Sequence, residues 1–111
     1  MQMGKYQRTK GAGFERYRAN WWKNLGFKDA RRNLNQYQKT DGRDITGVEG
    51  FCEQDKCGKS INIRAAYDEA WNAAGLDEIP IAAIKYDRGQ VLIVISETHF
   101  GELLKKGGQN G

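Results

Sequence analysis

The chain has 111 residues, of which 39% are hydrophobic and 11% aromatic, which suits one folded domain and argues against disorder along its whole length. Its longest clean apolar run, residues 91–95, is far shorter than the ~20 residues that cross a bilayer, and its N-terminal residues lack the apolar core of a secretory signal. Two cysteines are too few for a disulfide framework. The composition therefore predicts a single-domain cytoplasmic protein without a membrane segment.

The net charge of +4 is unevenly distributed along the chain. Residues 1–32 carry nine basic and two acidic side chains, a local balance of +7, whereas the other 79 residues carry nine basic and twelve acidic ones, a balance of −3. A basic segment beside a mildly acidic remainder indicates a polyanionic partner on one side of the molecule. A solvated basic helix without a partner is the alternative.

The predicted elements begin with an amphipathic helix from Lys10 to about Gly26. The expected buried stripe of this helix consists of apolar side chains at helical spacing: Phe14, Tyr17, Trp21 and Leu25. Trp22 is offset from this stripe. Three short strands are expected next, at residues 27–33, 44–48 and 51–56. A polar turn at 35–41 and a bend at Glu49-Gly50 separate these strands.

The second half of the chain predicts a helix, two strands and a last helix. Asn62 is the expected N-cap of a helix that ends near Ala74 and carries Tyr67 and Trp71 toward the core. The remaining elements are buried strands at 79–86 and 90–96, joined by a tight turn at 87–89, and a helix at 99–106. The order α-βββ-α-ββ-α predicts one α/β domain at 10–106 around a mixed central sheet, with a basic arm at 1–9 and a flexible tail at 107–111.

Carboxylates and a lysine gather on the two strands between Gly42 and Lys56. Because side chains alternate along a strand, Gln54 and Lys56 are expected on one face, and Glu53 and Asp55 on the other. Asp44 on the neighbouring strand could meet one of these faces. Mg²⁺ prefers oxygen ligands, and a nearby lysine can orient the attacking water, so such a site hydrolyses phosphodiesters. A charged hairpin exposed to solvent has the same spacing.

Four segments in order resemble motifs of the small PD-(D/E)XK nucleases of the archaeal and phage Holliday-junction resolvase type. Residues 10–16 read KGAGFER, residues 42–45 read GRDI, residues 51–63 read FCEQDKCGKSINI, and IPI at 79–81 with VLIV at 91–94 resembles the last two strands. The likeness covers residues 10–104. It implies a restriction-endonuclease-like fold and a Mg²⁺-dependent endonuclease, with Mn²⁺ as a substitute, that resolves four-way DNA junctions.

The resemblance also implies roles for individual residues. Glu15, Asp44 and position 54 would hold the metal, and Lys56 would position the water. Position 54 is Gln54 where the pattern has glutamate, and an amide offers one neutral carbonyl oxygen in place of two charged ones. Three explanations are open: an inactivating replacement, a native glutamine compensated by Glu69 on the following helix, or a register slip that brings in Glu53. The slip is disfavoured because it would turn Lys56 away as well.

Basic residues are the expected contacts to DNA phosphates, although each also fits a plain surface cation. Those of the N-terminal segment are Lys5, Arg8, Lys10, Arg16, Arg31 and Arg32, and Lys59 and Arg64 would hold the scissile phosphate. Cutting two opposed strands of a two-fold junction needs two sites, so the resemblance implies a homodimer in the cytoplasm of a prokaryotic or phage-infected cell. A silent DNA-binding protein and a flap or nicking nuclease are the alternatives.

Two further groups of residues are expected to play no part in chemistry. Cys52, Cys57 and His99 lack the spacing of a zinc site, so the cysteines are predicted to be reduced and structural. His99, at the start of the last predicted helix, is expected to be a cap or a surface residue.

Overall fold

The computed structural model describes residues 5–34 and 42–109, and the side chains of residues 9–34 and 42–108. The predicted polar turn at 35–41 lies outside the described residues. The elements are α1 (Lys5–Asn24), β1 (Arg31–Arg32), β2 (Ile45–Thr46), β3 (Phe51–Gly58), α2 (Ile63–Ala73), β4 (Ile79–Tyr86), β5 (Leu92–Val94) and α3 (Glu97–Gln109). The predicted α/β order α-βββ-α-ββ-α is confirmed. Among the described residues, no helix is long and apolar enough to cross a membrane.

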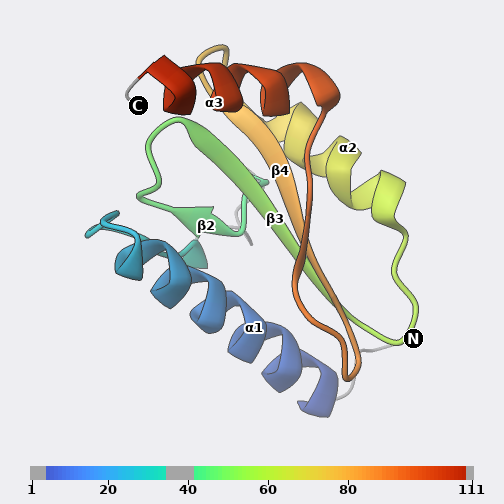
Figure 1. Cartoon of the computed structure of the whole chain (residues 1–111). Coiled ribbons are helices and arrows are strands. Elements are labelled where there is room, and N and C mark those ends of the chain that lie inside the picture. The colour runs from blue at the N-terminus through green and yellow to red at the C-terminus, as the bar shows by residue number, and fades with distance from the viewer. Residues whose placement is uncertain (1–4, 35–41, 110–111) are drawn as a thin grey trace.

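The five strands form one mixed sheet in the order β1-β2-β3-β4-β5 (Figure 1). β3 and β4 are parallel and joined through α2, and the other three pairings are antiparallel. α1 packs on β1 to β3, and α2 packs on β3 and β4. Side chains of β3 reach α1 and α2 alternately, because Glu53 bonds to α1 and Lys56 to α2. The two helices therefore cover opposite faces of the sheet.

The core under α1 is built around Trp22, which is 4% exposed. Its ring makes edge or tilted contacts with Phe27 and Phe51, with centroids 4.9 and 5.1 Å apart. A smaller cluster under α2 contains Ala66, Ala82 and Ile84. Small residues on α2 allow the helix to approach the sheet closely, whereas Ile63 and Trp71 of the same helix are exposed.

The predicted buried stripe of α1 is wrong in three of its four members. Trp21 is 37% exposed, and Tyr17 and Leu25 are exposed as well. The buried line instead follows Phe14, Arg18 and Trp22 at a spacing of four residues. An arginine in the middle of this line hides it from a count of apolar periodicity. The helix also begins at Lys5, so part of the predicted arm is helical.

Strand lengths and the last helix differ from expectation. The strand predicted at 27–33 shrinks to Arg31–Arg32, because residues before it form a turn in which Ala30 N donates to Phe27 O. This turn lies so close to Gly47 (φ +80°) that a Cβ there would be 2.0 Å from Asp29 O. β5 is three residues long and half exposed at the sheet edge, not buried. α3 extends to Gln109, through part of the predicted tail.

Other local predictions are confirmed. The Asn62 side chain accepts a hydrogen bond from Ala65 N at 2.9 Å as the N-cap of α2. β4 has the predicted bounds, and the turn after it holds Arg88 at φ 63°. Trp71, however, is 56% exposed and does not belong to the core.

Candidate active site

Asp44 is hydrogen-bonded to β3 just before β2 begins. Its backbone N–H donates to Glu53 O at 2.9 Å, and its side-chain Oδ2 accepts from Asp55 N at 2.8 Å. The side chain is buried, with 7% of the residue exposed. Asp44 therefore extends the pairing of β2 with β3 by one residue, through one backbone and one side-chain hydrogen bond.

Three charged residues from distant parts of the chain act electrostatically on Asp44: Glu15 from α1, Lys56 from β3 and Glu69 from α2. Burial raises the pKa of Asp44 to about 7, and Glu15 and Glu69 add to this rise, while the Asp55 N–H and Lys56 oppose it. Three residues that the sequence singled out thus lie close enough to Asp44 to influence its pKa.

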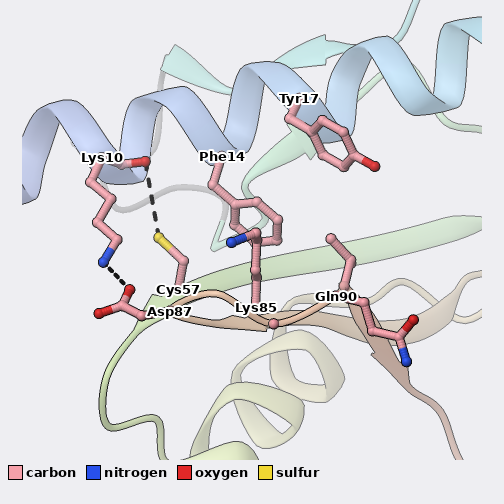
Figure 2. Close-up of a pocket in the computed structure, with 9 residues that line it drawn as sticks. Lys10, Phe14, Tyr17, Cys57, Lys85, Asp87 and Gln90 are labelled. Carbon is pink, nitrogen blue, oxygen red and sulfur yellow. Dashed lines mark hydrogen bonds and ion pairs between the residues drawn. The ribbon is translucent and has the colours of Figure 1, made fainter.

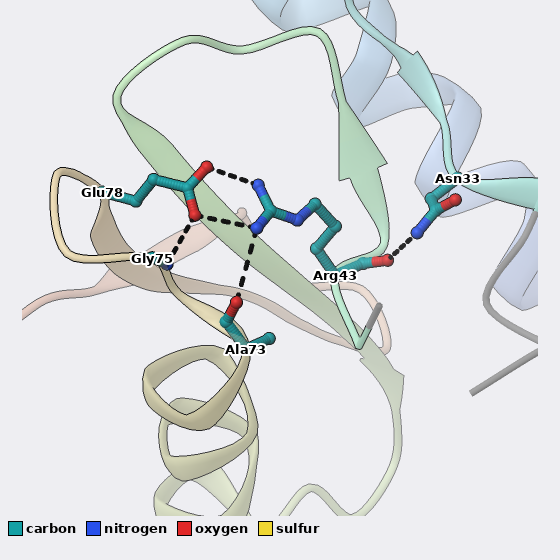
Figure 3. A network of polar contacts seen from close by, with 5 residues as sticks. All are labelled: Asn33, Arg43, Ala73, Gly75 and Glu78. Carbon is teal, nitrogen blue, oxygen red and sulfur yellow. Dashed lines mark hydrogen bonds and ion pairs between the residues drawn. The ribbon is translucent and has the colours of Figure 1, made fainter. Parts of the chain in front are cut away.

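Arg43, the residue before Asp44, connects this segment to neighbouring elements through hydrogen bonds (Figure 3). The Arg43 guanidinium donates to both carboxylate oxygens of Glu78, at 2.6 and 2.8 Å, and more weakly to Ala73 O at 3.4 Å. On the other side, Asn33 Nδ2 donates to Arg43 O at 2.8 Å. These contacts tie the segment to the end of α2, to the start of β4 and to the residue after β1, which restricts the position of Asp44.

Gln54 and Lys56 lie on the α2 side of β3, as alternation predicts. Gln54 is buried beside Gly42. Lys56 Nζ lies 3.2 Å from Glu69 Oε2 in a half-exposed ion pair. The acid proposed to compensate for Gln54 is therefore paired with the lysine expected to position water.

Glu53 has a structural role in the α1 face of the sheet. Arg18 Nε and Nη2 donate to its two carboxylate oxygens at 2.8 and 2.9 Å, and Trp22 Nε1 donates to Oε1 at 2.9 Å. Hydrogen bonds from Arg18 hold the pKa of Glu53 below its ordinary value against the opposing effect of burial. The structure therefore does not have the register slip that would bring Glu53 into a metal site.

Asp55 is a buried acid of this region to which the sequence assigned no role. It is 8% exposed, and its carboxyl group shares a side-chain hydrogen bond with that of Glu53. Burial, together with the neighbouring Glu53 and Asp44 carboxylates, raises the pKa of Asp55 well above its ordinary value. Alternation along β3 places it on the α1 side beside Glu53, but no sequence signal shows that the two carboxyl groups are hydrogen-bonded.

Acidic side chains do not converge on a ready-made metal cage in the part of the chain that the structure describes, since no three His, Cys, Asp or Glu side chains are grouped closely enough to hold an ion. Glu15, expected as a ligand, accepts a hydrogen bond from Arg32 Nε at 3.1 Å. The acids near Asp44 are thus distributed among ion pairs.

The expected DNA contacts fall into two groups. Arg16, Arg31 and Lys59 are exposed. The others with described side chains have acidic partners: Lys10 with Asp87, Arg32 with Glu15, and Arg64 with Asp68. The side chains of Lys5 and Arg8 lie outside the described residues.

A cavity of about 480 Å³ separates α1 from the turn between β4 and β5 (Figure 2). Its walls include the stacked rings of Phe14 and Tyr17, with centroids 6.4 Å apart, and the Lys85 side chain.

The two cysteines are free thiols. Cys57, at the edge of this cavity, is half-buried and its pKa is raised by burial, and Cys52 is buried. Ser96 is the N-cap of α3, since its Oγ accepts a hydrogen bond from His99 N at 3.1 Å, and His99 is a half-buried residue of the first turn and not the cap.

Comparison of the chain with protein-family models, curated proteins and solved structures found no significant match.

Proposed function

We propose that this protein is a metal-dependent DNA endonuclease with a restriction-endonuclease-like fold of the PD-(D/E)XK type, acting on four-way junctions. The observation that carries the proposal is a buried Asp44 within electrostatic reach of Glu15 and Lys56. These three residues come from separate motifs, so their nearness is not a consequence of local sequence. The mixed sheet, with α1 and α2 on opposite faces, is compatible with that fold.

The surroundings of Asp44 fit a hard divalent cation such as Mg²⁺ or Mn²⁺. Asp44 is a buried carboxylate within electrostatic reach of Glu15, Lys56 and Glu69, and a buried carboxylate requires a proton, a hydrogen-bond donor or a cation. Mg²⁺ is commonly held by one or two carboxylates and completes its shell with water. When bound, it would lower the pKa of a water and neutralise charge on the phosphate.

The chain's own residues would then position the reactants. Lys56, oriented by Glu69, would hold the attacking water through a hydrogen bond. Gln54 would occupy the place of the family's glutamate, where its carbonyl oxygen would be a neutral ligand. The exposed Arg16, Arg31 and Lys59 would contact backbone phosphates, so binding should weaken steeply with salt.

The test of this function is cleavage of a labelled four-way junction, a flap and a plain duplex in Mg²⁺, by the chain and by Gln54→Glu. Gln54→Glu is expected to raise the cleavage rate, because it restores a charged ligand. Lys56→Met should remove activity from both forms while leaving the thermal unfolding temperature nearly unchanged, since its ion pair is half exposed.

Each alternative has its own outcome in this test. Cleavage only after Gln54→Glu would identify a disabled nuclease. Binding without cleavage by either form would favour a silent DNA-binding protein and contradict the proposal. A preference for the flap would favour a flap or nicking nuclease over a resolvase.

A second copy of the chain is the partner that α3 fits, as expected for a junction with two scissile strands. Phe100 and Leu104 on α3 are 52% and 60% exposed. A helix of 13 residues has only marginal stability without packing. We therefore expect another surface to cover the face of α3 that carries Phe100 and Leu104. α3 is acidic in its first turn, at Glu97, and basic in its last, at Lys106. In an antiparallel pair across a two-fold axis, each acidic end meets the other copy's basic end.

Leu104→Glu is expected to convert the dimer to a monomer in sedimentation velocity at micromolar concentration, because it places a charge in an apolar contact. The matched control is Leu76→Glu, which makes the same change at a leucine exposed in a loop and should leave the dimer intact. A parent chain that sediments as a monomer would contradict this pairing.

A further inference from the structure

The cavity between α1 and the turn that joins β4 to β5 has a volume of about 480 Å³, which lies within the range of pockets that take small ligands. Its lining residues in the described part of the chain include none of the proposed metal ligands, so it is a separate feature of the molecule. It adjoins the candidate site, however, because Glu15 acts electrostatically both on Asp44 and on Cys57 at the edge of the cavity.

One wall of this cavity is a pair of nearly parallel aromatic rings on α1. The ring planes of Phe14 and Tyr17 differ by 13°, and their centroids lie 6.4 Å apart. Phe14 is 7% exposed, whereas Tyr17 is 53% exposed. A buried ring thus packs against an exposed one, which presents a flat apolar surface. Nucleobases of any sequence stack on such surfaces, because every base has a π-face.

The edge of the cavity is positively charged. Lys10, Lys59 and Lys85 all act electrostatically on Asp87, so three lysines share one acid. Lys10 forms an ion pair with Asp87, whereas Lys85 has no ion pair within the described part of the chain. Figure 2 shows the Lys85 side chain pointing from β4 toward α1, along the wall of the cavity. This excess of positive charge favours an anion such as a phosphate.

A flat apolar surface beside a cation suits a ligand that combines a planar ring with a negative charge. Gln90, which also lines the cavity, adds an amide that can donate to and accept from the edge of a base. A nucleotide has a ring, an edge and a phosphate. Bases of a duplex are stacked on one another and cannot enter a side pocket, whereas an unpaired nucleotide can.

We propose that this cavity accepts one unpaired nucleotide of the bound DNA, with its base stacked on Tyr17 and its phosphate paired with Lys85. This inference rests on the proposed function, because it takes DNA as the substrate. It adds a contact that favours DNA with unpaired nucleotides over a plain duplex. The ion pair of Lys10 with Asp87, which joins α1 to the turn after β4, would close one end of the cavity (Figure 2).

DNA binding in EDTA tests this contact separately from cleavage. Fluorescence anisotropy compares a labelled duplex that has a gap of unpaired nucleotides in one strand with the fully paired duplex of the same length. The full chain is expected to bind the gapped DNA about tenfold more tightly, which is the usual effect of stacking one base on an aromatic side chain. Tyr17→Ala should reduce the affinity for gapped DNA to that for the paired duplex, and Tyr17→Phe, which keeps the ring, should retain the preference.

Matched variants control for position and charge. Trp71→Ala removes a ring that is 56% exposed on α2, across the sheet, and should keep the preference. Lys85→Gln should lower the slope of log affinity against log salt by about one for gapped DNA, whereas Lys105→Gln, at an exposed lysine of α3, should not. Far-UV circular dichroism checks that Tyr17→Ala is folded, as expected for a side chain that is half exposed. A folded Tyr17→Ala that keeps the preference would overturn the inference.

Failure of this inference and failure of the nuclease function are distinguishable. If the parent cleaves a junction but binds gapped and paired DNA equally well, only the inference is overturned. If the preference depends on Tyr17 but neither the parent nor Gln54→Glu cleaves any DNA, the inference stands and the nuclease function is overturned. If the parent binds no DNA, both are overturned. Deoxyadenosine monophosphate that displaces gapped DNA at micromolar concentration would identify a site for a free nucleotide and overturn the assignment to DNA.

Discussion

Replacing Arg18 with methionine is expected to lower the free energy of unfolding by about 3–5 kcal/mol, the usual effect of removing one partner of a buried ion pair. Arg18 and Glu53 are 2% and 0% exposed. Methionine preserves most of the volume but removes the two guanidinium hydrogen bonds to Glu53, so that a buried carboxylate loses its cationic partner. Urea unfolding followed by tryptophan fluorescence measures the loss.

Two controls separate the buried charge from other effects of this substitution. Arg16→Met makes the same change at an exposed arginine of the same helix and should alter stability by less than about 0.5 kcal/mol. The double variant Arg18→Met, Glu53→Leu removes both charges and should recover much of the loss. An Arg18→Met variant as stable as the parent would contradict the structural role of Glu53.

Asp44→Asn is expected to stabilise the metal-free protein while abolishing cleavage. Burial raises the pKa of Asp44 to about 7, from an ordinary value of 3.8. The native state therefore holds this proton more tightly than the unfolded state, so the stability that the proton contributes is lost as pH rises from about 4 to 7. Asparagine never ionises and keeps an oxygen that can accept from Asp55 N.

The advantage of Asp44→Asn should thus depend on pH. In EDTA its free energy of unfolding should match that of the parent near pH 4 and exceed it by about 4 kcal/mol at pH 8. Urea unfolding at both pH values measures this, and Mg²⁺ should narrow the gap at pH 8 by binding only the parent. A gap that is the same at both pH values would show that Asp44 ionises normally in the fold.

Much of the candidate site was predictable because it depends on short-range rules. The motifs singled out Glu15, Asp44 and Lys56, and the structure brings Glu15 and Lys56 within electrostatic reach of Asp44. Alternation along β3 correctly separated Lys56 from Glu53. What the motifs could not supply is the pairing of each charge, because ion pairs such as Arg32 with Glu15 join segments whose approach depends on the packing of α1.

The amino-acid sequence by itself determined the order of elements, the Asn62 cap, the bounds of β4 and the faces of β3, since these follow from local backbone preferences and side-chain periodicity. Tertiary structure alone decided that Arg18 and Trp22 are buried instead of Trp21, because Glu53 reaches α1 from a strand 31 to 35 residues away. It likewise joined the Asp55 backbone N–H to Asp44 Oδ2, which connects β3 to the segment before β2. Hydrophobic patterns record where apolar surface is buried, but a buried charge is stable only where another segment compensates it, and that depends on the whole fold.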